Sequence, residues 1–159
     1  MFRIVLYQPL IPPNTGNVIR LCANTGSQLH IVKPMGFELS EASVRRAGLD
    51  YHWMTEVYVH ESFANCRSAL KVEHPDARWY AIETGSARRY DQVAYQPFDV
   101  LLFGAEVKGL PAEVIEQLDP DALVSIPMYI GNRSLNLGNS VALVTYEAWR
   151  QQNFNQIPF

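Results

Sequence analysis

The stretch Asp99-Val100-Leu101-Leu102-Phe103 decides the fold class of this 159-residue chain. Its near-continuous apolar run is typical of a strand that is covered on both faces, as strands are in parallel sheets. Similar short runs recur along the chain, and the predicted strands are 4–7, 29–32, 57–59, 78–82, 99–103 and 123–126.

Helical patterns separate these strands. Asn14 is a good N-cap for the first helix, and Asn24-Thr25-Gly26 ends that helix. The later helices are predicted over 40–48, over 62–71, briefly after Pro111 and over 139–151. The alternation predicts one α/β domain over 1–159, with a mainly parallel sheet flanked by helices.

The composition is that of a folded domain with a large buried surface. Apolar residues make up 48% of the chain and charged residues only 18%. A well-filled core and an apolar face that pairs with a second copy would explain these values equally well. The formal net charge of −3 argues against a protein that holds nucleic acid by bulk charge alone, but it allows a local basic patch.

Cysteines, histidines and apolar runs give no sign of a metal site or a membrane segment. Cys22 and Cys66 lack metal-ligand spacing and are predicted to be free thiols in a reducing cytosol. The histidines form no metal motif, and His30, inside a predicted strand, is expected to be a core residue with its hydrogen bonds satisfied. The first apolar run is short and contains Arg3, and no run could span a bilayer. We therefore expect a soluble, cytoplasmic protein.

Three loops at the carboxyl ends of predicted strands combine glycine with amides, hydroxyls or charges. Ligands of open parallel sheets bind at those ends, and glycine lets the backbone approach a ligand closely. Singly, each loop has a plain structural explanation, such as helix capping by Asn14, Asn136 or Asn139 and turn formation by Gly104 or Gly109. Together they predict a ligand site. The loops span 14–20, 103–111 and 126–140.

Familiar nucleotide and hydrolase motifs are absent from the sequence. It contains no G-x-G-x-x-G loop, P-loop or G-x-S-x-G elbow, which argues against a nucleotide-binding oxidoreductase. The basic pairs Arg45-Arg46 and Arg88-Arg89 could reach phosphates, although a solvated surface is the commoner explanation of a two-residue run.

The loops belong to longer motifs that agree in order and spacing with one known superfamily. The motifs are Ile-Pro-Pro-Asn-Thr-Gly-Asn at 11–17 with its continuation to 26, and those at 45–52, 126–128, 133–137 and 146–150. Over essentially the whole chain they resemble the SPOUT RNA methyltransferases. Within that superfamily the chain is similar to the minimal bacterial enzymes that methylate the ribose 2′-hydroxyl of cytidine or uridine 34 in tRNA.

The resemblance implies a fold, a cofactor and partners. The C-terminal part of the chain would form a deep trefoil knot, although chains generally avoid knots. The enzyme would be a homodimer that binds S-adenosylmethionine in the knot, releases S-adenosylhomocysteine and requires no metal. Its RNA partner would be a tRNA anticodon stem-loop, with leucine tRNAs as the expected substrates.

The resemblance also implies roles for particular residues. The implied cofactor contacts are Ile82, Gly104, Ile126, Ser134 and Leu135. The implied catalytic set is Arg20, Asn14, Ser134, Asn136 and Glu106. A guanidinium stays protonated in proteins, so we expect Arg20 to stabilise the developing alkoxide rather than to act as base. Glu106 is expected to hold its loop or to orient Arg20, and a phosphate could assist deprotonation.

The chain departs from the family pattern at several positions. Ala105 replaces a usual proline, Val107-Lys108 replaces Thr-Arg, and Gly138 replaces serine. Glu83-Thr84-Gly85-Ser86 replaces a Thr-Lys-Gly-like turn. None of these changes removes an implied catalytic residue, but they bear on contacts with RNA.

Two other functions stay open. One is methylation of ribosomal RNA or of another tRNA position by the same kind of enzyme. The other is a non-catalytic RNA-binding module, against which the intact Arg20, Ser134 and Asn136 argue. The lack of an added RNA-binding domain favours a small, accessible target such as an anticodon loop.

Overall fold

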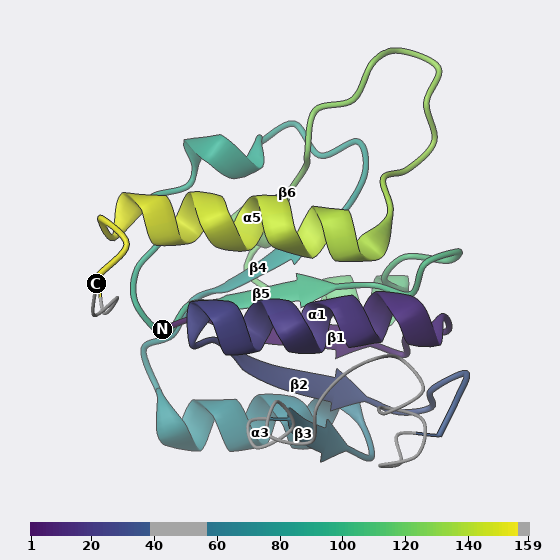
Figure 1. Cartoon of the computed structure of the whole chain (residues 1–159), viewed down its shortest axis with the longest axis vertical. Helices are drawn as coiled ribbons and strands as arrows, with labels where there is room; N and C mark the ends of the chain where they lie inside the picture. Colours follow the sequence, from purple (N-terminus) through teal and green to yellow (C-terminus); the bar gives the residue numbers. More distant parts are fainter. Residues whose placement is uncertain (39–56, 156–159) are drawn as a thin grey trace.

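A parallel sheet of six strands, in the order β3-β2-β1-β5-β4-β6, forms the centre of the part of the chain that the computed structural model describes, residues 1–38 and 57–155 (Figure 1). The strands are β1 (Arg3–Tyr7), β2 (Gln28–Val32), β3 (Val57–His60), β4 (Trp79–Ile82), β5 (Val100–Phe103) and β6 (Leu123–Val124). The helices are α1 (Pro12–Thr25), α3 (Phe63–Glu73), α4 (Ala112–Ile115) and α5 (Leu137–Gln151), with 3₁₀ turns η2 (Tyr90–Gln92) and η3 (Pro120–Ala122). The predicted α/β class and parallel sheet are confirmed.

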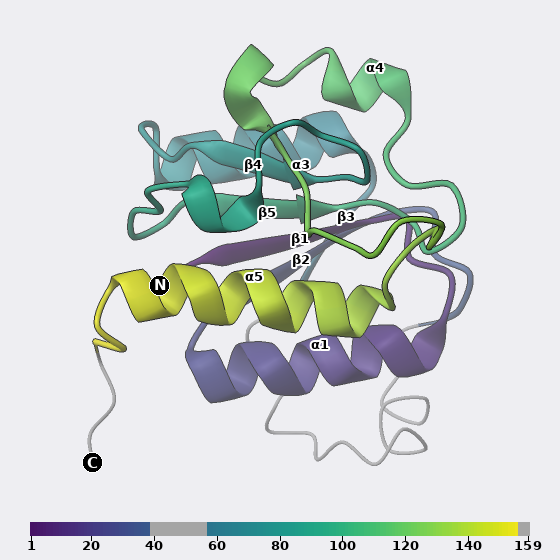
Figure 2. The same ribbon diagram turned by 90° about the horizontal axis from the view of Figure 1, so that it is seen from above.

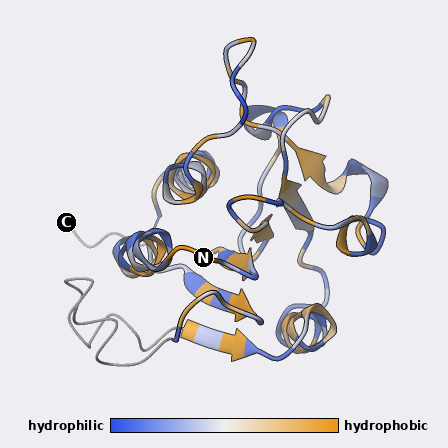
Figure 3. Ribbon diagram, turned by 90° about the vertical axis from the view of Figure 1, so that its right-hand side faces the viewer, coloured by the Kyte–Doolittle hydropathy of each residue, from blue (hydrophilic) through white to orange (hydrophobic). Residues whose placement is uncertain are grey.

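The central strands are buried because helices cover both faces of the sheet. Helices α1 and α5 pack side by side on one face, and α3 and α4 lie on the other (Figures 2 and 3). Successive residues of β5 point to opposite faces of the sheet. Leu101 and Phe103 pack in the core beneath α1 and α5, whereas Val100 and Leu102 pack in the core beneath α3 and α4. This two-sided burial explains the continuous apolar run that predicted the strand.

The first helix begins earlier than predicted. Its N-cap is Ile11 and its first residue is Pro12, so Asn14 lies inside the first turn instead of capping it. Proline fits the first turn because its fixed φ is helical and it lacks the N–H that would go unpaired there. The side chain of Asn14 is thereby released for contacts outside the helix.

The other differences lie at element ends. Strand β6 stops at Val124 rather than at 126, and α5 begins at Leu137 rather than at 139. The cap of α5 is Asn136, whose side-chain oxygen accepts a hydrogen bond of 3.2 Å from the N–H of Asn139. The helix predicted over 40–48, with Arg45 and Arg46, lies outside the described residues. Within the described ranges no helix has the length and apolar character that crossing a membrane requires.

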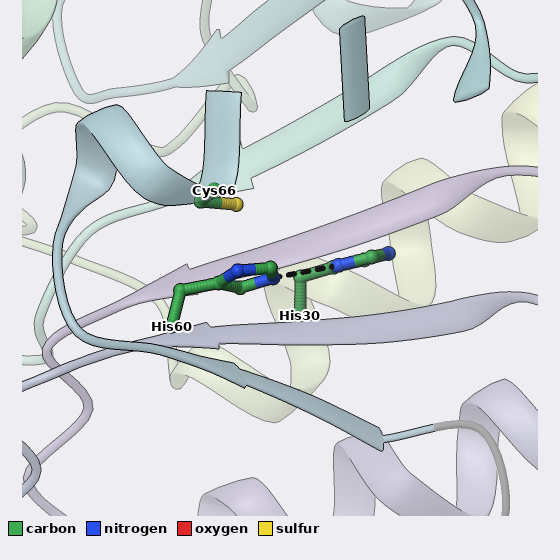
Figure 4. Close-up of side chains that lie close together, drawn as sticks. All are labelled: His30, His60 and Cys66. Carbon is green, nitrogen blue, oxygen red and sulfur yellow. Dashed lines mark hydrogen bonds between the residues drawn. The ribbon is translucent and has the colours of Figure 1, made fainter. Parts of the chain in front are cut away.

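His30 lies in the core on β2, and His60 at the end of β3 is its partner (Figure 4). Nδ1 of His30 lies 3.0 Å from Nε2 of His60, so one ring donates a hydrogen bond to the other. Nε2 of His30 has no partner, so the prediction of a fully satisfied histidine is only half right. The ligand atoms of His30, His60 and the nearby Cys66 all lie within 4.8 Å of one another, a grouping that their sequence spacing does not reveal. Burial lowers the pKa of His30 to about 3 and also lowers that of His60, so both rings are neutral at pH 7.

The buried imidazole of His30 should make stability fall in acid. Its folded-state pKa of about 3 lies below the unfolded value, so the unfolded chain binds the proton first as the pH drops below about 6.5. We expect the free energy of unfolding to fall over that range by up to about 1.4 kcal/mol per pH unit from this group. His30→Asn keeps a polar partner for His60 but cannot titrate. Urea unfolding between pH 7 and 4 should therefore show a shallower decline for the variant, and parallel declines would contradict the assignment.

Candidate active site

A cavity of about 610 Å³ opens at the carboxyl ends of β4, β5 and β6, where the three glycine-containing loops meet. It is lined by every predicted site residue except Arg20, namely Asn14, Ile82, Gly104, Glu106, Ile126, Ser134, Leu135 and Asn136. Its volume falls within the range of small-molecule sites. Arg20 lies on the exposed side of α1, outside the cavity lining.

The carboxylate of Glu106 holds the start of α1 against the loop that follows β5. It accepts hydrogen bonds from the backbone N–H of Leu10 at 2.8 Å, that of Ile11 at 3.0 Å and Nδ2 of Asn14 at 3.1 Å. Burial alone would raise the pKa of Glu106, but these donors outweigh it and lower the pKa. A carboxylate held ionised in this way is a poor general base, and its contacts fit the predicted role of holding the loop.

Asn14 extends this connection to the third loop. Its Oδ1 accepts a hydrogen bond of 2.9 Å from Nδ2 of Asn136, the residue that caps α5. The side chain of Asn14 is buried, with only 6% of the residue exposed, so both bonds lie in a shielded environment. Glu106, Asn14 and Asn136 therefore join the loops after β1, β5 and β6 into one hydrogen-bonded unit.

Closely packed backbone at Gly104 and Gly109 forms part of the cavity lining. A Cβ atom at Gly104 would lie 2.2 Å from the carbonyl carbon of Gly109, so only glycine fits at position 104. The loop closes on itself there, because the N–H of Gly109 donates to the carbonyl of Ala105 at 2.9 Å. Gly109 has a φ of +65°, which side chains disfavour. Backbone groups of this loop can thus lie directly beside a ligand.

The ionisable residues Glu83, Lys108 and Arg133 also line the cavity; Lys108 and Arg133 belong to the loops predicted for the ligand site, whereas sequence reasoning missed Glu83. Lys108 and Arg133 are exposed, while the Glu83 carboxylate accepts a 2.6 Å hydrogen bond from the N–H of Leu110. Burial raises the pKa of Glu83, and the N–H groups of Leu110 and Thr84 oppose that shift. The place of Glu83 directly after β4, at the same sheet edge as Gly104, is the signal that could have found it.

The basic pair at 88–89 does not reach this cavity. Arg88 donates to the carbonyl of Asp121 at 3.1 Å, and Arg89 forms an ion pair with Asp91. Both side chains bind neighbouring protein groups at the described surface. This agrees with the explanation that the pair belongs to a solvated protein surface.

Comparisons with known proteins agree with this geometry. The profile of the SpoU rRNA Methylase family matches residues 1–146. A curated relative from Methylovorus glucosotrophus (strain SIP3-4), named tRNA (cytidine(34)-2′-O)-methyltransferase, is 52% identical over 97% of this chain and 97% of its own length. A solved structure that gives insights into 2-OH methylation of C/U34 on tRNA has a TM-score of 0.87 and 40% identity, covering 98% of each chain.

The fold also occurs in more distant proteins. The SpoU methyltransferase AviRb from Streptomyces viridochromogenes, solved in complex with the cofactor AdoMet, has a TM-score of 0.79 and 22% identity, covering 95% of this chain and 57% of AviRb. That likeness concerns the fold alone. The family profile spans most of the chain, and the curated relative shares half of its residues over nearly the full length. The chain belongs to the SpoU rRNA methylase family.

Proposed function

We propose that the chain transfers a methyl group from S-adenosylmethionine to the ribose 2′-hydroxyl of cytidine or uridine 34 in the anticodon stem-loop of tRNA, with leucine tRNAs as substrates. The observation that carries this proposal is a relative named tRNA (cytidine(34)-2′-O)-methyltransferase, which is 52% identical over nearly the full length of both chains. It is supported by the cavity that gathers the predicted site residues. We also propose that the enzyme works in the cytoplasm, where tRNA is available.

The cavity lining fits the proposed methyl donor. Ile82, Ile126 and Leu135 supply apolar surface, and the close-packed backbone at Gly104 supplies peptide groups that can read a polar heterocycle. S-adenosylmethionine supplies a methyl group on a sulfonium sulfur, which is already electrophilic, so we propose that no metal takes part.

The chain's own contribution is chiefly positioning, which can supply roughly 7–11 kcal/mol of a barrier. Glu106 holds Asn14, and Asn14 holds Asn136, so these groups fix the cavity wall where the ribose would lie. Ser134 is proposed to position the donor and the ribose. Arg20 is proposed to stabilise charge that develops on the ribose oxygen. Because Arg20 lies outside the cavity lining, bound RNA or a second copy of the chain must complete that contact.

We also propose a homodimer and a C-terminal knot. Leu143 and Tyr146 on α5 are each 44% exposed, and a second copy would cover them. For the knot, the support is the path of the chain. Strand β6 lies at the sheet edge beside β4, whereas α5 packs against α1 and β5, so the segment between must cross the carboxyl ends of β4 and β5. The β4–β5 connection meets the far end of α5, where the N–H of Tyr95 donates to Gln151 at 3.0 Å.

Methyl transfer to RNA tests the proposed function directly. Unmodified and modified bulk tRNA are incubated with the protein and radiolabelled S-adenosylmethionine, and the labelled nucleosides are identified and mapped. We expect label in 2′-O-methylcytidine or 2′-O-methyluridine at position 34. Label that appears only in ribosomal RNA would favour the other enzymatic function. Absence of both label and donor binding would favour the non-catalytic module.

Replacing Arg20 separates its proposed role from donor binding. Arg20→Ala should leave the affinity for S-adenosylmethionine unchanged but lower turnover by about 10²–10³-fold, the usual effect of losing one group that stabilises a developing oxyanion. Arg20→Lys keeps a cation, so its turnover should fall by less than that of Arg20→Ala. Single-turnover rates and calorimetric binding constants measure the two effects, and an undiminished rate would remove Arg20 from the mechanism.

Replacing Glu106 should loosen the joined loops. Glu106→Gln removes the charge that three N–H donors share, so we expect the free energy of unfolding to fall by about 1–3 kcal/mol. Turnover should fall by roughly tenfold to a hundredfold, because a displacement of about 1 Å at the reacting groups can cost that much. The matched control is Glu113→Gln, an exposed carboxylate on α4. If both variants behave alike in urea unfolding and in turnover, Glu106 does not hold the site.

A further inference from the structure

The position of Glu83 sets it apart from the other ionisable residues of the cavity. Its backbone N–H donates to the carbonyl of Val124 at 3.0 Å, which ties the end of β4 to the end of β6. Its carboxylate reaches the opposite way, to the N–H of Leu110 in the loop after β5. Glu83 therefore stands where the three strand ends that carry the cavity come together.

The carboxylate of Glu83 lies flat against the loop backbone. A Cβ atom at Gly109 would lie 2.9 Å from each of the two carboxylate oxygens. Gly109 and Leu110 in turn press on Gly104, since a Cβ atom there would lie 2.4 Å from the Leu110 nitrogen. Glu83 thus packs against the same closely packed loop as the two glycines, and it is a half-buried residue of the cavity lining.

Of the two carboxylates that line the cavity, Glu83 has more lone-pair sites left to accept further hydrogen bonds. The ionisable side chains that line the cavity are Glu83, Glu106, Lys108 and Arg133. The Glu106 carboxylate already accepts three hydrogen bonds that fix α1, whereas Lys108 and Arg133 are exposed cations. An ionised carboxylate offers about four lone-pair sites, and the N–H groups of Leu110 and Thr84 use part of that capacity in Glu83.

We propose that Glu83 distinguishes the methyl donor from its product by charge. The inference rests on the proposed function. In the transfer, the ribose oxygen forms a bond to the methyl carbon, the electron pair of the broken C–S bond stays on sulfur, and the hydroxyl proton leaves to water. The sulfonium cation becomes a neutral thioether. Glu83 attracts the cationic donor and loses that attraction once the methyl group has gone, which favours exchange of product for fresh donor.

The half-buried position of Glu83 gives this charge its effect. Charges interact more strongly in a partly desolvated cavity than in water, where they are screened. Burial raises the pKa of Glu83, and a cation bound beside the carboxylate favours its ionised form again. Lys108 and Arg133 are exposed cations of the same lining, and they suit the phosphates of an RNA substrate.

Calorimetric titration of the full chain with S-adenosylmethionine and with S-adenosylhomocysteine tests the proposal. Glu83→Gln keeps the side-chain length and an oxygen that can accept from Leu110, but it removes the charge. We expect its Kd for S-adenosylmethionine to rise roughly tenfold, as for loss of one charge-assisted contact, with the Kd for S-adenosylhomocysteine changing by less than about twofold. Glu83→Ala also loses the contact with Leu110, so both ligands should bind more weakly. Glu113→Gln removes an exposed charge outside the cavity and should change neither constant.

Equal weakening of both ligands by Glu83→Gln would overturn the proposal, because the residue would then act only by holding the loop. Unchanged binding of both ligands would overturn it as well. Thermal unfolding of each variant shows that it is folded before it is titrated. Failure of the proposed function looks different: the wild-type chain itself would then fail to bind S-adenosylmethionine, or would bind it without labelling nucleotide 34 of tRNA.

Discussion

The site depends on one set of hydrogen bonds around the half-buried carboxylate of Glu106. A carboxylate on the loop after β5 accepts from two backbone N–H groups and from Asn14, all at the start of α1. Leu10 and Ile11 directly precede the first turn of α1, and an anion suits that end of the helix dipole. Through Asn136, the same set reaches the N-cap of α5. Two helices and three loops are thereby held relative to one another by hydrogen bonds.

The sheet supplies the rigid base for this arrangement. Because β1 and β5 are buried beneath helices on both faces, their carboxyl ends cannot move independently. The loops that follow such strands begin from fixed points. Short loops with no regular secondary structure of their own can therefore still build a defined cavity. The polar groups of the cavity are then held by one another, and the strands contribute apolar side chains at their carboxyl ends, such as Ile82.

The strands of the sheet could be predicted from the sequence, but the contacts between the loops could not. Apolar runs such as 99–103 identify buried strands because burial on two faces leaves no polar alternation. Asn14 shows the limit: its residue type predicts an N-cap, and nothing local reveals that Pro12 starts the helix and frees Asn14 to bind Glu106 and Asn136. The pairing of His30 with His60 and the position of Glu83 also depend on the register of distant strands. Identification of the site residues came from resemblance to relatives, since no single loop excluded a purely structural explanation.

The close approach of Gly104 to Gly109 affects how this protein can diverge from its relatives. A binding surface built from peptide groups does not change when neighbouring side chains are substituted, provided that the path of the loop is kept. Ala105, Val107 and Lys108 lie between the two glycines, and Val107 and Lys108 are exposed. Substitutions at these positions can accumulate and alter the choice of RNA while the pocket floor stays the same. The constrained glycines thus separate two traits that evolution can then select independently: recognition of a shared small molecule and discrimination among large substrates.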